Sequence, residues 1–371
     1  MRSSISSSDQ RLPKRVWRPV LLGAILIAIL SIALMENDLA RQGYRATLPD
    51  SPRLWGRARA RASHFGKQAL ILVGDSRMQL DVDLGVLRRE TGLQPVQLAL
   101  SGESSFVPVL EGLANDPTVQ GTLLVSYLEG GPLDAGIRDR STNYESEYEW
   151  SRSQIIPSFR VVEPALDDLV HASLRSYADG ARPIDTLRIR VLQQGRMPQF
   201  LQTLPDRSQL ADFTRVPMPD FYYGRAQRAL GRDLPMPAGA TYADLDAALH
   251  QTIATIAPID NSAFLRNLAY VESLVASVRA HGGRVVFIKL PTSGFILEIE
   301  RKRYPRAMFW DRLVASTSAQ ALHFEDDPIL RQFVCPEGSH LDYRQRASFT
   351  ERLVHALASM PASRASSPVA R

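Results

Sequence analysis

The chain has 371 residues, of which 44% are hydrophobic and 22% are charged. These values are ordinary for a globular protein, and they exclude collagen, a coiled coil, a mostly disordered chain and a membrane protein of many spans. The formal net charge of +5 would suit a nucleic-acid partner, but its distribution does not. Residues 1–19 carry a net charge of +4, residues 361–371 carry +2, and the rest of the chain carries −1. We therefore expect no nucleic-acid partner.

An uncharged apolar stretch, residues 20–35, follows the basic N-terminus. Its length is slightly below the roughly 20 residues that a membrane helix needs, and interfacial side chains before it can extend it. The positive charge that precedes it places residues 1–15 in the cytoplasm and the chain after about residue 37 outside. We expect a single-pass anchor in the inner (cell) membrane, with the rest of the chain periplasmic. The alternative is a cleaved signal peptide, because Ser31-Ile32-Ala33 has the small-x-small form of a cleavage site.

Cysteine and histidine usage argues against a metal site. Cys335 is the only cysteine, so neither a disulfide within the chain nor a cluster of thiolate ligands can form. No two histidines have the spacing of metal ligands. We expect no metal and no cofactor.

Five short apolar runs, each closed by Gly, Pro or acidic residues, predict buried parallel strands. They are residues 69–73, 96–100, 122–127, 285–288 and 321–324.

Helical patterns lie between these runs. Asp83 can cap a helix over 84–91 that Gly92 ends, and Ser105, Ser262 and Asp342 precede three more. The alternation predicts an α/β fold with a doubly wound, parallel, five-stranded sheet.

The alternation fails between residues 131 and 260, where Arg, Pro, Tyr and Asp are frequent. We expect a mostly helical insertion that caps the carboxyl edge of the sheet, with helices near 165–177 and 242–256. The predicted organisation has seven parts: a cytoplasmic tail (1–15), a transmembrane anchor (16–36), a juxtamembrane stalk (37–65), a first domain segment (66–130), the insertion (131–260), a second domain segment (261–360) and a disordered tail (361–371).

The strongest chemical signal is Gly74-Asp75-Ser76, which follows the first predicted strand. Ligands in open α/β sheets bind beyond the carboxyl ends of strands. A serine nucleophile there needs a base, and the base needs an acceptor that fixes its tautomer. His340, with Glu337 three residues before it, can supply both, and Gly102 can add an oxyanion donor. Taken alone, the triplet also fits a turn in which Asp75 and Ser76 cap a helix.

These motifs together resemble the SGNH (GDSL-like) hydrolase superfamily. The resemblance implies that Ser76 is the nucleophile, His340 the base, and the N–H groups of Ser76 and Gly102 oxyanion donors. The family acid is normally Asp, whereas this chain has Glu337, with Asp342 as a rival. The family's Gly-x-Asn-Asp block after the third strand is also missing, because residues 126–131 read Ser-Tyr-Leu-Glu-Gly-Gly.

A single anchor on such a domain resembles the accessory proteins of envelope polysaccharide O-acylation, of the DltD, AlgJ and AlgX type. The resemblance implies an acyl esterase or O-acyltransferase with an acyl donor, a glycan acceptor and a multi-span membrane acyltransferase or polysaccharide synthase complex as partners. The missing Asn block leaves a non-catalytic subunit that binds glycan or acts as a scaffold as the alternative. In the insertion, Tyr222-Tyr223-Gly224-Arg225 can either stack on a sugar or pack the insertion onto the sheet.

Overall fold

The computed structural model describes residues 17–102, 105–128, 140–153, 159–178, 181–182, 198–235 and 237–361. The chain forms two compact units, Met1–Ala46 with Ser173–Gln199, and Thr47–Ala172 with Phe200–Arg371. The predicted tail over 1–15 lies outside the described residues, as does the predicted tail over 361–371 apart from residue 361.

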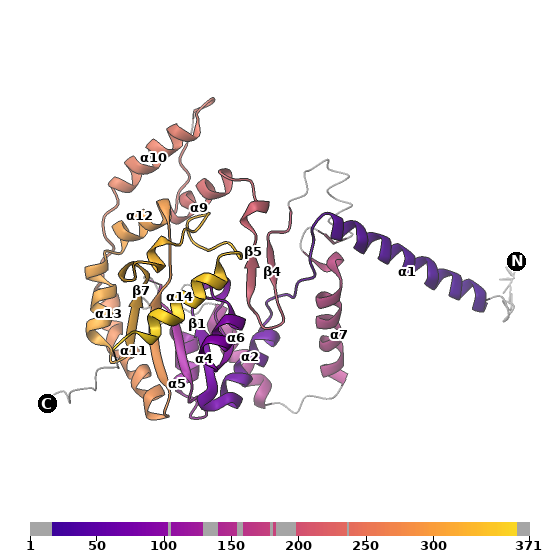
Figure 1. The fold of residues 1–371 in the computed structure, drawn as a ribbon, viewed down its shortest axis with the longest axis horizontal. Coiled ribbons are helices and arrows are strands. Elements are labelled where there is room, and N and C mark those ends of the chain that lie inside the picture. Colours follow the sequence, from indigo (N-terminus) through magenta and orange to yellow (C-terminus); the bar gives the residue numbers. More distant parts are fainter. Residues whose placement is uncertain are drawn as a thin grey trace, which may run out of the picture. The chain divides into compact units, whose positions relative to one another are not determined.

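The larger unit is built on a parallel sheet of five strands in the order β2-β1-β3-β6-β7 (Figure 1). The strands are β1 (Ala69–Val73), β2 (Gln94–Gln97), β3 (Thr122–Ser126), β6 (Arg284–Lys289) and β7 (Gln320–His323). The chain runs from β1 to β2 on one side and then returns to β3 on the other side of β1. The strand order therefore reverses between β1 and β3, where ligand sites form in open α/β sheets.

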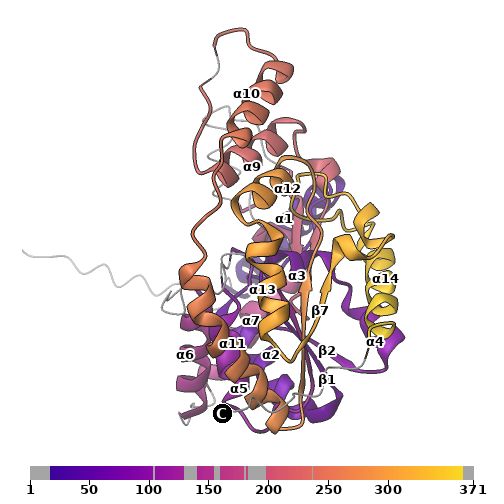
Figure 2. The same ribbon diagram turned by 90° about the vertical axis from the view of Figure 1, so that its left-hand side faces the viewer.

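Helices cover both faces of this sheet. Ile71 and Val73 pack in one apolar cluster with α2 (Pro52–Phe65), α5 (Val107–Ala114), α11 (Ser262–Ala280) and α13 (Trp310–Ser316). Leu70 and Leu72 pack in another cluster with α4 (Leu84–Thr91) and α14 (Arg346–Ala358). Successive strand residues point to opposite faces, so the two clusters lie on opposite sides of the sheet (Figure 2). This unit also contains α3 (Ser76–Asp81) and α12 (Gly294–Arg303).

Local signals set several boundaries. The helix predicted over 84–91 is α4, whose N-cap Asp83 accepts a hydrogen bond from Val86 N and whose C-cap Gly92 is left-handed. β2 begins at Gln94, two residues before the predicted run, and ends at Gln97, three residues before the predicted end. The side chain of Gln97 is fully buried, and it donates to Met78 O at 3.1 Å.

The prediction of a polar stalk over 37–65 is wrong for its second half. Helix α2 lies in the core of the larger unit, where Trp55 and Ala58 are fully buried. Arg59 is also fully buried, and it pairs with Glu145 at 3.3 Å and Asp116 at 3.2 Å. The arginine-rich sequence suggested solvent exposure, but acids far along the chain neutralise this charge.

The predicted insertion is not one helical cap. It contains α6 (Arg140–Ser153), α7 (Phe159–Ser173), α9 (Asp220–Leu230) and α10 (Tyr242–Ala254), together with an antiparallel pair, β4 (Leu201–Thr203) and β5 (Gln209–Ala211). Residues 173–199 belong to the smaller unit. The buried Arg207 joins the β4-β5 pair to the end of β2, because it donates to Gln97 O at 2.6 Å and Ala99 O at 3.1 Å.

The smaller unit is built on α1 (Trp17–Arg41), which has 25 residues and a mean hydropathy of 2.3 in its most apolar window. Such a helix is about 37 Å long, which is enough to cross a bilayer. The helix continues beyond the predicted end at residue 36. Glu36 there accepts hydrogen bonds from the backbone N–H groups of Arg175 at 2.8 Å and Ser176 at 2.9 Å. A segment distant in sequence is therefore fixed to the polar end of this helix.

Candidate active site

The turn after β1 presents Ser76 at the carboxyl edge of the sheet, as the first residue of α3. Gly74 has a φ of +132°, and a Cβ there would lie 2.5 Å from Ser126 Cβ, so only glycine fits. Asp75 is buried, and its Oδ1 accepts a hydrogen bond from Ser126 Oγ at 2.9 Å. Asp75 therefore links the ends of β1 and β3, a structural role that leaves Ser76 partly exposed beside them.

Ser76, His340 and Glu337 form one chain of hydrogen bonds. Ser76 Oγ lies 2.7 Å from His340 Nε2, and His340 Nδ1 lies 2.7 Å from Glu337 Oε1. The three residues come from the two ends of the larger unit, because Ser76 and His340 are 264 positions apart. This is the geometry of a nucleophile, a base and an orienting acid.

The environment of Glu337 assigns the protons along this chain. The carboxyl group is 1% exposed, and burial alone would raise its pKa. Hydrogen bonds from His340 and from Ser339 N, together with the charges of His340 and Arg225, outweigh burial and lower the pKa of Glu337. An ionised carboxylate can only accept hydrogen bonds, so His340 Nδ1 carries a proton. In the neutral imidazole, His340 Nε2 then accepts the hydrogen bond of the Ser76 hydroxyl.

Asp342, the rival acid, has other partners. Its Oδ2 accepts from Phe213 N at 2.9 Å, and its Oδ1 accepts from Arg344 N at 3.1 Å and from the Arg344 guanidinium at 2.9 Å. The hydrogen bond from His340 goes to Glu337 instead. Asp342 therefore shapes the loop before α14 and does not orient the base.

The expected oxyanion donor Gly102 lies in a turn after β2, is exposed and has a φ of +80°. Two residues earlier, Leu100 N donates to Gly74 O at 3.0 Å, so this turn belongs to the edge of the sheet that carries Ser76. The role of Gly102 N–H stays a prediction. In the segment that follows β3, Tyr127 is buried against Trp310, and residues 129–131 lie outside the described part of the chain.

Arg225 belongs to the aromatic-basic cluster that was predicted to stack on a sugar or to pack the insertion, and its contact with the triad was not predicted. It lies on α9 in the insertion, and its Nε is 2.6 Å from Glu337 Oε2. The neighbouring Tyr222 and Tyr223 pack against Phe295 of α12, and Tyr222 OH accepts from Phe295 N at 2.9 Å. The aromatic pair therefore fixes α9 on α12, and Arg225 extends from that junction to the acid of the triad.

A buried ionic network lies behind Ser76 and was also missed. Arg77 donates to Glu300 Oε1 at 2.5 Å, and Lys289 Nζ donates to Glu300 Oε2 at 3.0 Å. Arg77 Nε also lies 3.4 Å from Ser339 Oγ. Arg77 follows Ser76 in the chain, and Ser339 precedes His340. The network therefore contacts the triad through the chain neighbours of its serine and its histidine. Lys289, a lysine at the end of a buried strand, is the sequence signal that could have indicated this network.

Asp81 on α3 holds the loop that carries His340 by a hydrogen bond to its backbone. It is fully buried, and its Oδ1 accepts from Leu341 N, the residue after His340, at 2.9 Å. Burial raises the pKa of Asp81 well above its usual range.

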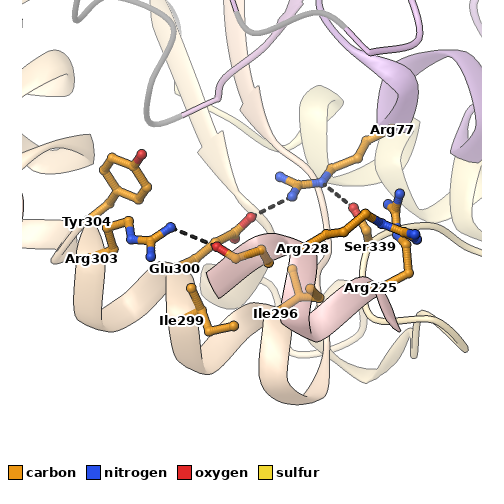
Figure 3. Close-up of a pocket in the computed structure, with 10 residues that line it drawn as sticks. Arg77, Arg225, Arg228, Ile296, Ile299, Glu300, Arg303, Tyr304 and Ser339 are labelled. Carbon is orange, nitrogen blue, oxygen red and sulfur yellow. Dashed lines mark hydrogen bonds and ion pairs between the residues drawn. The ribbon is translucent and has the colours of Figure 1, made fainter. Parts of the chain in front are cut away.

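A pocket of about 380 Å³ lies beside the triad (Figure 3). Its charged wall consists of Arg77, Arg225, Arg228, Arg303 and Glu300, and its apolar wall includes Ile296, Ile299 and Tyr304. Ser339, the neighbour of His340, closes one side.

A comparison with protein-family models gives no match, and a comparison with curated proteins gives none. The geometry of the site therefore carries the functional argument. Among the described residues, no group of three His, Cys, Asp or Glu side chains is placed to hold a metal ion.

Proposed function

We propose that the protein is a membrane-anchored acyl esterase or O-acyltransferase that acts on a cell-envelope or exported polysaccharide. The observation that carries the proposal is the hydrogen-bonded chain Ser76–His340–Glu337, with its buried and ionised acid. The parallel sheet, its strand order and the position of the serine after β1 support an SGNH-like, doubly wound fold.

The reaction proceeds in two balanced steps. Ser76 Oγ attacks the carbonyl carbon of an ester donor, and its proton moves to His340 Nε2. The bond from that carbon to the alcohol of the donor breaks, and the alcohol leaves with the proton from His340, so Ser76 holds the acyl group as an ester. His340 then takes a proton from a glycan hydroxyl or from water, whose oxygen attacks the ester carbon. The bond from that carbon to Ser76 Oγ breaks, and His340 returns the proton to Ser76 Oγ. Glu337 stabilises the imidazolium in both steps.

The localisation belongs to the same proposal. Helix α1 anchors the chain, the basic residues before it stay in the cytoplasm, and the larger unit faces the periplasm. A multi-span acyltransferase or polysaccharide synthase complex in the same membrane would supply the acyl donor.

Substitution of the triad tests the mechanism. Ser76→Ala and His340→Ala, in the full chain in detergent, are each expected to lower p-nitrophenyl acetate hydrolysis by about 10⁴-fold or more, with unchanged circular dichroism. Ser348→Ala is the matched control, because Ser348 is an exposed serine on α14. Full activity in either triad variant would overturn the mechanism.

A fluorophosphonate probe separates this proposal from a non-catalytic subunit. The motivation for the second function is the segment after β3, where the family's Asn block is missing and Tyr127 fills a buried position. Labelling at Ser76 that disappears in His340→Ala supports the enzyme. A folded protein that binds glycan but resists the probe supports the subunit.

A further inference from the structure

The pocket beside the triad has a large excess of positive charge. Four arginines and one glutamate line it. Glu300 is already shared between Arg77 and the buried Lys289, and Asp75 Oδ2 lies 4.0 Å from Arg77 Nε. Glu337 balances Arg225 from the far side of the pocket wall. The charges in and immediately behind the pocket therefore retain an uncompensated positive balance, which favours an anionic ligand.

The four arginines of the pocket differ in whether their guanidinium groups already have partners within the protein. Arg303 donates to Ala229 O at 2.7 Å and Leu230 O at 3.2 Å, at the end of α9. Arg77 and Arg225 each pair with a carboxylate. Arg228 is exposed, lines the pocket and has no side-chain partner among the described residues. Its guanidinium has free donors in the fork geometry that carboxylates and phosphates accept.

The rest of the wall suits a sugar more than a small inorganic ion. Ile296, Ile299 and the ring of Tyr304 provide an apolar surface on which a sugar ring can pack. The volume of about 380 Å³ falls within the range of small-molecule sites. The combination of an apolar wall with arginine side chains matches a pyranose ring that carries a negative group.

The pocket is joined to the triad by covalent neighbours and by one direct contact. Arg77 follows Ser76, Ser339 precedes His340, and Arg225 lies 2.6 Å from the Glu337 carboxylate. Figure 3 shows Arg77 bonded to both Glu300 and Ser339 along this wall. Ser76 and His340 do not themselves line the pocket, so a ligand held here lies beside the triad and its next unit would extend towards Ser76.

We infer that this pocket binds an anionic sugar residue, the charged unit of an acidic polysaccharide that serves as the acceptor. The role of the ligand as acceptor rests on the proposed function, whereas its binding does not. The shared chemistry is a carboxylate or phosphate on a sugar ring, held by Arg228 and the neighbouring arginines.

The test is equilibrium binding to the full chain in detergent, carried on Ser76→Ala so that no turnover occurs. The probes are tetragalacturonate, its neutral methyl ester and glucose 1-phosphate. Tetragalacturonate or glucose 1-phosphate is expected to bind, the methyl ester is expected to bind at least about tenfold more weakly, and added salt is expected to weaken the binding. Preference between the two anions identifies the negative group.

A matched pair of arginine variants locates the ligand. Arg228→Gln is expected to weaken the binding of the anionic probe about tenfold. Arg88→Gln is expected to leave the binding of the anionic probe unchanged. Arg88 is an exposed arginine that does not line the pocket, and it lies on α4, which packs with Leu70 and Leu72 of β1. Equal binding of the acid and its ester, equal effects of the two variants, or no binding of either anion would overturn the inference. Activity in Ser76→Ala would instead overturn the proposed function and leave the binding result standing.

Discussion

Glu337 uses both of its carboxylate oxygens, one for His340 and one for Arg225. This arrangement explains how a glutamate can occupy a position where aspartate is usual in the resembled family. The longer side chain reaches the base and a cation from a different part of the chain at once. The acid is consequently fixed at both oxygens, which limits the geometric freedom that its extra methylene would bring.

We predict that Glu337→Gln lowers kcat by about 10⁴-fold, because the neutral amide can neither fix the imidazole tautomer nor stabilise the imidazolium. The measurement is steady-state ester hydrolysis by the full chain. Asp342→Asn is the control, since Asp342 bonds to Phe213 N and Arg344 and is expected to change stability more than rate. A comparable loss in Asp342→Asn would contradict the assignment of the acid.

Arg225 is a positioning residue whose loss should appear in the pH profile. Its charge helps to lower the pKa of Glu337, so Arg225→Gln raises that pKa. The acidic limb of kcat/KM then moves to higher pH, and the activity deficit is largest at low pH and shrinks as the pH rises. Arg225→Lys should restore part of the wild-type limb. A uniform loss at every pH, without movement of the limb, would show that Arg225 contributes only to packing.

The sequence predicted the residues that carry short motifs and missed those that act across long distances. Gly74-Asp75-Ser76 and the Glu337–His340 pair are recognisable because their members lie within three positions of one another. Arg225 has no such neighbour, because the contact with Glu337 exists only after α9 has docked on α12. The choice between Glu337 and Asp342 likewise required the path of the loop, since both acids lie within three residues of His340.

At the scale of elements, the turn from β1 into α3 is the most constrained part of the site. We predict that Gly74→Ala lowers the free energy of unfolding by at least about 2 kcal/mol, because φ is +132° and the new Cβ would meet Ser126. Thermal unfolding measures the change. Gly224→Ala in α9 is the control: no atom lies within 4 Å of its Cβ, and alanine favours helix by up to about 1 kcal/mol. Similar losses in both would refute this account of the turn.

The ionic network between β6, α12 and α3 makes stability depend on pH. Although burial opposes ionisation, the charges of Arg77 and Lys289 lower the pKa of Glu300 to about 2, below the value of about 4.3 in an unfolded chain. The stabilisation by Glu300 is therefore full above about pH 4 and is lost as the pH falls towards 2.

We predict that Glu300→Gln costs about 3–5 kcal/mol at neutral pH, because it leaves buried cations without their partner. The difference from wild type should narrow as the pH falls below about 4, measured by chemical unfolding over a pH series. Glu351→Gln removes an exposed carboxylate on α14 and should cost less than about 1 kcal/mol. A deficit that is constant with pH would contradict the low pKa.

Elements whose apolar pattern is local were predictable, whereas α2 was not. Helix α4 has its cap, its apolar face and its stop within ten residues. Helix α2 contains several arginines and read as exposed, yet Arg59 is buried against Asp116 and Glu145. The partners of Arg59 come from α6 and from the turn after α5, so the sequence of α2 alone does not show that Arg59 is buried.

At the scale of the whole molecule, membrane orientation can be tested through the single cysteine. Cys335 is 2% exposed, and burial raises the pKa of its thiol, so a thiol reagent should not label the wild-type chain. We predict that Ser348→Cys reacts with a membrane-impermeant maleimide in intact spheroplasts, whereas Ser7→Cys reacts only after lysis. The opposite labelling pattern would contradict the proposed orientation. Recovery of the chain in the soluble fraction after carbonate washing would contradict the membrane anchor.

The separation of Ser76 from His340 has a consequence for biosynthesis. A chain that crosses a membrane from its anchor onward exposes the serine first and the histidine much later, since 264 positions lie between them. Arg225 would likewise cross the membrane well before its partner Glu337, because it lies earlier in the chain. A partly translocated chain therefore presents an inert alcohol, and the nucleophile gains its base only once nearly the whole larger unit has emerged and folded. Under the proposed function, the order of the chain would therefore keep Ser76 from attacking acyl donors before the larger unit has folded.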